Sequence, residues 1–367
     1  MPQTPLNDVH ARLGASFTDF GGWQMPVRYS SDLAEHEAVR TAAGLFDISH
    51  MAEIFVSGEN AAAFLDFALV GQASLIKNSR AKYSLIVRAD GHVIDDLIVY
   101  RLNDDEFLII ANAGNRHAVF DSLSERAATF GFAGLSDRSD EFALLAIQGP
   151  NATAILQSLT ATDLGALPYY SIAAGVIAGK EIYFCRTGYT GEDGFELLFE
   201  AAQAERIFEL LLEKGKPQGL LPAGLACRDT LRLEAGMPLY GHELDLETNP
   251  FEAGLGRVVK LDREADFVGK AALAELANAP QKKQLVGLVG EGRRAARAEY
   301  QLFANESSTE PIGTITSGAL APTLGYPVAM AYVNPDFAQI GTTVSCDIRG
   351  NRLDMTVVKL PFYKREN

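Results

Sequence analysis

The spacing of hydrophobic and polar positions changes repeatedly along the chain, and each change predicts a different element. Residues 31–43 carry apolar side chains at helical spacing, with Ser30 or Ser31 as the cap and Gly44 as the stop. In residues 45–58, apolar and polar positions alternate, which indicates a strand. This segment therefore predicts a capped helix that leads into a strand.

Residues 81–112 predict three strands in succession. Asp90-Gly91 is typical of the first turn between them, and the polar residues 103–105 are typical of the second. Amphipathic helices are predicted on either side, at 59–70 and 115–130. The elements that follow are predicted as a strand at 141–150, two strands within 181–199, and helices at 201–214 and 222–235, with Gly236 as the final cap.

A polar, proline-containing stretch at 275–283 marks a change in the pattern. Beyond it, short apolar runs alternate with Gly and Pro, which is typical of a small barrel. These strands are predicted at 284–289, 312–316, 328–333, 342–348 and 353–359. The expected fold class is α+β with several domains. Residues 1–278 would form an α+β region of two interleaved subdomains, the inner one near 52–140, and residues 279–367 an all-β barrel or jelly-roll domain.

Length and charge exclude several classes of protein. A chain of 367 residues exceeds the size at which one core keeps growing. The 32 basic and 47 acidic residues give a net charge of −15, which repels phosphate backbones. No apolar run is long enough to span a bilayer, and the first residues lack the pattern of a signal or transit peptide. We therefore expect a cytoplasmic protein that binds neither nucleic acid nor membrane.

The cysteines and histidines give no indication of a metal or disulfide site. Cys185, Cys227 and Cys346 are far apart and form no C-x-x-C pair, so we expect buried, reduced thiols. No two of the six histidines have the spacing of ligands on one helix face. We therefore expect no metal cofactor.

Several short motifs have more than one interpretation. Asp95 and Asp96 are successive strand residues and must face opposite sides of a sheet, either as residues next to a turn or with one of them doing chemistry. Gly188, Gly191 and Gly194 are interpreted as turn formers, because they do not make a dinucleotide-binding motif.

A series of longer strings carries a resemblance to a known family. They are DFGGWQMPV (19–27), LFDISHM (45–51), DDLIVY (95–100), IQGP (147–150), RTGYTGEDGFE (186–196), RDTLRLEAGMPLYG (228–241), DFVGK (266–270), TSG (316–318) and PFY (361–363). In this order, they resemble the glycine cleavage T-protein family from end to end. The resemblance implies a cloverleaf-like arrangement of three domains around a central channel that holds tetrahydrofolate.

The resemblance also implies an activity. A T-protein takes the aminomethyl group from the lipoyl arm of the H-protein and passes its carbon to tetrahydrofolate. The products are ammonia and 5,10-methylenetetrahydrofolate, and tetrahydrofolate acts as a co-substrate without a metal. The implied partner is the lipoylated H-protein.

Carried over position by position, the resemblance assigns the site residues. Asp96 takes the catalytic role, because a carboxylate beside the reacting nitrogens can manage protons and a cationic carbon. Glu196 would accept the two N–H donors on the folate ring edge, and Arg228 would contact a carboxylate or Glu196. The remaining residues expected to line the folate channel are Met51, Tyr83, Asn112, Tyr169 and Tyr189.

Nearby charged residues are expected to have other roles. Glu192 and Asp193 are interpreted as turn residues. Arg232 is expected to be a surface charge that pairs with Asp229 or Glu234.

Three observations qualify the resemblance. Arg257 stands where Trp is common in the family, and Lys364 stands where Arg is frequent. The basic cluster Arg293, Arg294 and Arg297 either guides the acidic partner or the folate tail, or is simply a solvated loop.

Two other functions remain open on the residues. One is a folate-dependent demethylase of methylated sulfur or nitrogen compounds. The other is a non-enzymatic folate-binding iron–sulfur assembly factor, whose Cys-containing K-G-C-Y-x-G-Q-E motif is replaced here by RTGYTGEDGFE.

Overall fold

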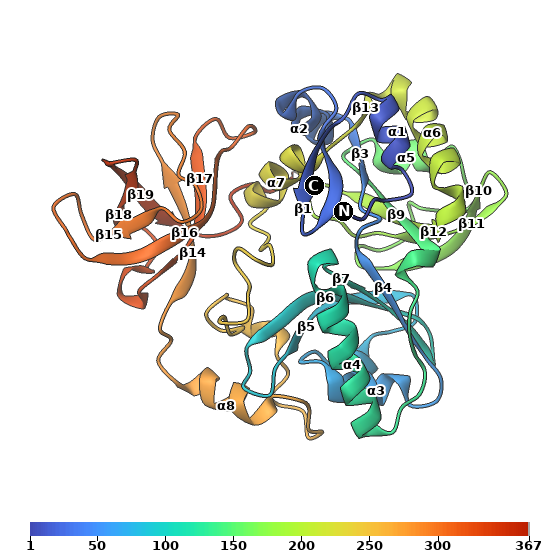
Figure 1. The fold of residues 1–367 in the computed structure, drawn as a ribbon, viewed down its shortest axis with the longest axis horizontal. Helices are drawn as coiled ribbons and strands as arrows, with labels where there is room; N and C mark the ends of the chain where they lie inside the picture. Colours follow the sequence, from blue (N-terminus) through green and yellow to red (C-terminus); the bar gives the residue numbers. More distant parts are fainter. Residues whose placement is uncertain (366–367) are drawn as a thin grey trace. The chain divides into compact units, whose positions relative to one another are not determined.

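The computed structural model describes residues 1–365, so the last two residues of the expected C-terminal domain lie outside the described residues (Figure 1). The chain divides into two compact units. The first unit consists of Met1–Ile86 and Asp96–Arg228, and the second of Val87–Asp95 and the chain from Asp229 onward. Within residues 1–365, no helix combines the length and the apolar composition needed to cross a bilayer.

The first unit contains a six-stranded sheet with the strand order β10-β11-β12-β9-β3-β13. All its pairings are antiparallel except that of β13 with β3. The strands are β3 (Ala43–Asp47), β9 (Phe142–Gln148), β10 (Ile172–Ile177), β11 (Lys180–Cys185), β12 (Gly194–Glu200) and β13 (Leu220–Pro222).

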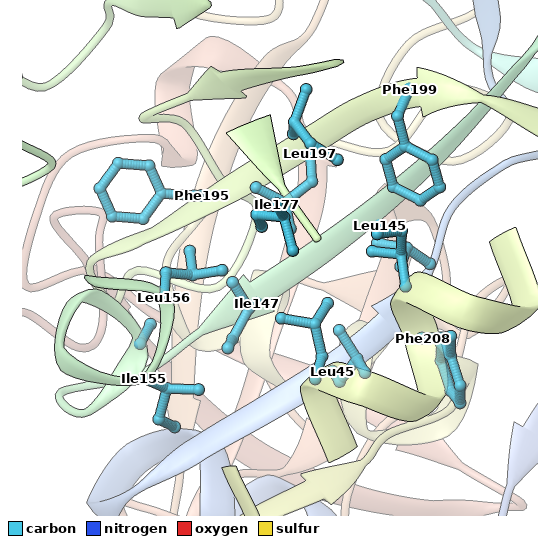
Figure 2. Close-up of a cluster of buried hydrophobic side chains, with 14 of the residues drawn as sticks. Leu45, Leu145, Ile147, Ile155, Leu156, Ile177, Phe195, Leu197, Phe199 and Phe208 are labelled. Atoms are coloured by element: carbon cyan, nitrogen blue, oxygen red, sulfur yellow. The ribbon is translucent and has the colours of Figure 1, made fainter. Parts of the chain in front are cut away.

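One face of this sheet carries a cluster of buried hydrophobic side chains, which Figure 2 shows. Leu145 and Ile147 of β9 and Leu197 of β12 point into it together with Phe208 of α6. Because side chains alternate along a strand, the residues between them face the other side of the sheet. The helices of this region are α1 (Asn7–Arg12), α2 (Asp32–Thr41), α5 (Ala152–Gln157) and α6 (Ala204–Gly215), and a separate hairpin is formed by β1 (Ser16–Phe20) and β2 (Trp23–Arg28).

A five-stranded sheet has the order β5-β6-β7-β4-β8. Two helices, α3 (Ala61–Ala68) and α4 (Arg116–Phe130), accompany it and bury Phe64, Leu65 and Leu123 (Figure 1). The strands are β4 (Ala52–Ser57), β5 (Arg80–Val87), β6 (Val93–Asn103), β7 (Glu106–Ala111) and β8 (Leu135–Asp137). The three strands predicted for residues 81–112 are therefore confirmed.

The second unit contains a closed six-stranded barrel. Its core consists of apolar side chains from every strand, among them Leu288, Ile315 and Val357. The strands are β14 (Gln284–Gly290), β15 (Gln301–Phe303), β16 (Pro311–Leu320), β17 (Pro327–Val333), β18 (Thr343–Ile348) and β19 (Asn351–Val358), and α8 (Lys270–Asn278) precedes them. The mixed α and β content and the C-terminal barrel expected from the sequence are confirmed.

Two local predictions were wrong. Gly44 does not stop the first predicted helix, because α2 ends at Thr41 and Gly44 lies inside β3. A Cβ at Gly44 would lie 2.4 Å from a methyl group of Val39, so this glycine permits close packing of α2 on the strand. Residues 45–58 form parts of two strands with a turn between them.

The prediction for Arg232 was wrong in its surroundings. This residue lies on α7 (Leu225–Glu234) and is only 1% exposed. It pairs with Asp229, as expected, but also with the fully buried Glu243 at 2.9 Å. Its guanidinium further donates to the Ser317 hydroxyl. The sequence pattern of the helix does not show these distant partners.

The prediction of buried thiols is confirmed. Cys185, Cys227 and Cys346 are buried and are not joined in a disulfide. Burial raises the pKa of the Cys185 and Cys227 thiols well above the ordinary value, which keeps them protonated and unreactive.

Candidate functional site

Asp96 lies on β6 in the first unit and is held by Tyr83 of β5 and by Asn112, which directly follows β7. The Tyr83 hydroxyl donates to its Oδ2 at 3.0 Å, and the Asn112 amide donates to its Oδ1 at 2.8 Å. Burial raises the pKa of Asp96, and these two hydrogen bonds oppose the rise. The structure therefore brings together three of the residues predicted to form the site.

The two aspartates of the DD pair have different surroundings. Asp95 is fully buried, whereas Asp96 is half-buried and carries the bonds from Tyr83 and Asn112. This difference follows from the alternation of side chains along β6. It confirms that the two carboxylates face opposite sides of the sheet.

Glu196 lies on β12 and is bonded through one of its oxygens. The Thr187 hydroxyl donates to Oε2 at 2.6 Å, and the Tyr100 hydroxyl donates to the same oxygen at 3.4 Å. Among residues 1–365, no group hydrogen-bonds Oε1. Burial raises the pKa of Glu196, while the Thr187 hydrogen bond and the Arg228 charge lower it. A carboxylate with a free oxygen is suited to accept N–H donors from a ligand.

Tyr100 joins the surroundings of the two carboxylates. It lies four residues after Asp96 on β6, so both side chains leave the same face of the strand, roughly 13 Å apart. Its hydroxyl lies 2.7 Å from the Thr187 hydroxyl, beside Glu196. Tyr100 therefore connects the strand that carries Asp96 with the surroundings of Glu196.

Arg228 supplies positive charge beside Glu196. Its guanidinium carbon lies 4.6 Å from the centre of the Tyr189 ring, a cation–π distance. It comes from α7, and it borders a small pocket together with Tyr189 and Glu196. The other residues that line this pocket are Phe46, Ile48, Ala146, Gln148 and Thr190.

Met51 and Tyr169 are less closely tied to the two carboxylates. Met51 is half-buried directly before β4, whose Ala52 pairs with Ala111, so Met51 comes close to Asn112. Tyr169 is 42% exposed, with its ring edge-on to that of Tyr170 at 5.0 Å. Neither residue is shown bonding Asp96 or Glu196.

Glu192 and Asp193 have structural partners. Glu192 forms a buried ion pair with Arg40 at 2.8 Å, and Asp193 pairs with Arg186 at 2.6 Å. These contacts fix the glycine-rich loop through ion pairs, in addition to any role of the two residues in the turn itself.

The glycines of this loop do not all form turns. Gly191 has φ of +82° and fits that interpretation. The reason for Gly188 is different, because a Cβ there would overlap the Gln148 side chain at 1.9 Å. A Cβ at Gly194 would lie 2.3 Å from the Ile147 carbonyl oxygen. Close packing therefore explains Gly188 and Gly194.

Several residues of the site were not predicted. Tyr100 lies on the same strand face as Asp96, so the alternation of side chains could have indicated its place in the site. No sequence pattern indicated Thr187, because its contacts with Tyr100 and Glu196 form only in the folded chain. His50 is fully buried, and burial with the Arg228 charge lowers its pKa to about 3, which keeps the ring neutral.

Within residues 1–365, no cluster of three or more His, Cys, Asp or Glu side chains is arranged to hold a metal ion.

Comparisons with known proteins cover nearly the whole chain. Residues 6–263 match the family described as the GCVT N-terminal domain, and residues 283–364 match the glycine cleavage T-protein C-terminal barrel domain. The chain is 54% identical to an aminomethyltransferase of Saccharopolyspora erythraea, over 99% of this chain and 98% of that one. It is 43% identical to an aminomethyltransferase of a Geobacillus species, over 100% and 99% of the two chains.

A solved structure shows the same fold. It is the glycine cleavage system aminomethyltransferase T from Bartonella henselae, with a TM-score of 0.92 and 37% identity. The match covers 99% of this chain and 98% of that chain.

Proposed function

The chain belongs to the glycine cleavage T-protein family and is an aminomethyltransferase, and from that premise we propose that Asp96 carries out its chemistry on tetrahydrofolate. The proposed donor is the aminomethyl group on the lipoyl arm of the H-protein. The shared description of the relatives favours this activity over the demethylase and the iron–sulfur assembly factor considered above.

The reaction determines what the site must do. The carbon of the aminomethyl group loses its bonds to sulfur and to the amine nitrogen, and it gains bonds to N5 and N10 of the folate. Two protons leave N5 and N10. One of them ends on the released ammonia and the other on the dihydrolipoyl sulfur. A group beside the folate nitrogens must therefore accept and return protons while the carbon is cationic.

Asp96 is suited to this role by the way it is held. Tyr83 and Asn112 fix its two oxygens, so the carboxylate is oriented before the substrate arrives. Burial raises the pKa of Asp96, which makes the carboxylate a better base than an exposed one. Its negative charge also stabilises a neighbouring cationic carbon. The bonds from Tyr83 and Asn112 are the observation on which the proposal chiefly rests.

Glu196 is proposed to recognise the folate ring. The edge of that ring offers two adjacent N–H donors, and the Oε1 of Glu196 is not bonded by any described residue. Arg228 lies close enough to lower the pKa of Glu196, so it helps to keep the carboxylate charged. Tyr189, which stacks with Arg228, is proposed to form the wall of the ring site. We propose that Met51 and Tyr169 line the folate channel as well.

The basic cluster in the second unit is proposed to attract the acidic partner. Arg294 and Arg297 line a pocket of about 390 Å³ with Arg349 and Tyr300, and none of the lining residues is acidic. In a chain of net charge −15, such a patch is a local site of attraction for a negative surface. The alternative that this loop is only solvated predicts no effect of its charge on the partner.

The activity is tested with H-protein loaded with the aminomethyl group. Ammonia and methylenetetrahydrofolate are measured with and without tetrahydrofolate. We expect ammonia release that depends strongly on folate, with the two products in equal amounts. Tight folate binding without ammonia release would contradict the proposed donor, and methylated sulfur and nitrogen compounds would then be screened as substrates.

A further inference from the structure

Tyr170 has a backbone conformation that is rare for an aromatic residue. It lies two residues before β10 and has φ of +60°, in the left-handed region. Bulky side chains are genuine outliers there, and such residues persist only where their surroundings impose the conformation. The sequence gives no sign of this feature, since Gly or Asn is the residue expected at such a position.

The backbone of Tyr170 is fixed from both sides. Its N–H donates to the Arg186 carbonyl at 2.9 Å, and its carbonyl accepts from the Ala81 N–H at 3.0 Å. The next residues continue these links, because Ile172 donates to the Ser79 carbonyl. The direction of the Tyr170 side chain is therefore set by β5 and by the strand end at Arg186, not by a free loop.

The Tyr170 side chain lies among the residues of the site. Burial raises its pKa, and the negative charges of Glu196 and Asp96 both add to the increase. Tyr170 in turn contributes to the raised pKa values of Tyr83 and Tyr100.

The backbone contacts of Tyr170 place it beside both parts of the site. Ala81, which donates to its carbonyl, lies two residues before Tyr83, whose hydroxyl donates to Asp96. Arg186, which accepts from its N–H, directly precedes Thr187, whose hydroxyl donates to Glu196.

The Tyr170 hydroxyl is available to a ligand. Among residues 1–365, no group hydrogen-bonds it, and its ring contacts that of Tyr169 edge-on at 76°. The residue is half-buried, and its hydroxyl oxygen is not one of the buried polar atoms that lack a partner, so it is accessible to solvent. A ligand that displaces this solvent must replace its hydrogen bonds, because an unsatisfied buried hydroxyl is costly.

We propose that Tyr170 is a positioning residue for the folate co-substrate, packing its ring against the bound ring system and hydrogen-bonding it through the hydroxyl between Asp96 and Glu196. This inference rests on the proposed function. It explains why a strained conformation is kept at a position where a smaller residue would be more stable. Tyr170 would act by holding the folate and not by transferring protons.

The test compares tetrahydrofolate binding with stability in two variants. Tyr170→Phe removes only the hydroxyl and is expected to raise the dissociation constant about 3- to 10-fold. Tyr170→Asn also removes the ring but tolerates the left-handed backbone. It is expected to weaken binding about 10-fold or more, while its melting temperature stays equal to that of the natural protein or rises. Tyr326→Phe, at a tyrosine in the second unit that is 38% exposed, is the matched control.

The outcomes separate this inference from the proposed function. Natural protein that fails to bind tetrahydrofolate would overturn both. If the natural protein binds tetrahydrofolate and both Tyr170 variants bind it equally well, only the role of Tyr170 is overturned. Weaker binding by both Tyr170 variants, with unchanged binding by Tyr326→Phe and no loss of melting temperature, supports it.

Discussion

Glu243 in the second unit and the two carboxylates of the candidate site in the first unit are satisfied in different ways. In the second unit, Glu243 accepts two hydrogen bonds at each oxygen, from Arg232 and the Leu239 N–H at one and from the Ser317 and Thr316 hydroxyls at the other. In the first unit, Asp96 and Glu196 are held by hydroxyl and amide groups, and within residues 1–365 neither of them forms an ion pair.

This difference distinguishes a carboxylate that stabilises the fold from one that can bind or react with a substrate. A saturated ion pair has no capacity left for a ligand. A carboxylate held by neutral donors keeps a raised pKa, as Asp96 and Glu196 do, and retains lone pairs for a substrate. The comparison predicts that substitutions in the two networks affect different properties of the protein.

The largest expected effect is on stability. Arg232→Met removes the cation and leaves Glu243 buried without its charge partner, which should lower the free energy of unfolding by about 3–5 kcal/mol. Asp229→Asn removes the exposed partner of the same arginine and should cost at most about 1 kcal/mol. Urea denaturation of both variants measures the difference. Equal losses would show that the buried pair is not what stabilises this region.

The next effect is on ligand binding. Glu196→Gln removes a charged acceptor and should weaken tetrahydrofolate binding by about 1.5–3 kcal/mol, or roughly 10- to 150-fold. Glu192→Gln is the matched control in the same loop, because Glu192 pairs with Arg40 and is not proposed to contact folate. Titration calorimetry compares the two dissociation constants. A similar loss in both variants would show that the ligand-binding carboxylate is wrongly assigned.

A third carboxylate sharpens the comparison through pH. Glu53 is fully buried, and no described residue hydrogen-bonds its side chain. Burial therefore raises its pKa well above the ordinary value. The folded state keeps the Glu53 proton to a higher pH than the unfolded state does. The free energy of unfolding should therefore fall as pH rises above about 4.3, by up to about 1.4 kcal/mol per pH unit.

The decline should end once the pH exceeds the raised pKa of Glu53. Glu53→Gln removes this titration, so its unfolding free energy should depend less steeply on pH. Denaturation curves at a series of pH values measure the two slopes. Identical slopes would exclude Glu53 as the cause.

The smallest effect concerns the partner. Reversing the charge of Arg293 and Arg294 should raise the apparent KM for H-protein several-fold and reduce its dependence on salt, because long-range attraction is lost. The kcat should stay close to that of the natural protein. An unchanged KM at low salt would show that the cluster is only a solvated loop and does not attract the H-protein.

Local patterns predicted much of the first unit. The period of two in DDLIVY separates the buried Asp95 from Asp96, and the three strands of this region were predicted from their apolar runs and the turn residues between them. Resemblance supplied the roles of Asp96 and Glu196, which no spacing could provide. The bonds from Tyr83 and Asn112 to Asp96 then appeared only in the folded structure.

The features that the sequence did not predict depend mostly on contacts between residues that are far apart in the chain. Arg232 looks like a surface residue of a helix, because Glu243 and Ser317 come near it only after folding. The backbone of Tyr170 is likewise set by hydrogen bonds to Arg186 and Ala81. The strand β15 has only three residues, too few for a periodic pattern, and it went unpredicted.

The central claim, that Asp96 carries out the chemistry, is tested most directly with Asp96→Asn. The measurement is the turnover number for ammonia release from loaded H-protein at saturating tetrahydrofolate, alongside the folate dissociation constant. The substitution keeps the size of the side chain and its capacity to be held, so binding should stay within a few-fold while turnover falls by about 10² or more. Near-normal turnover with normal binding would contradict the role assigned to Asp96.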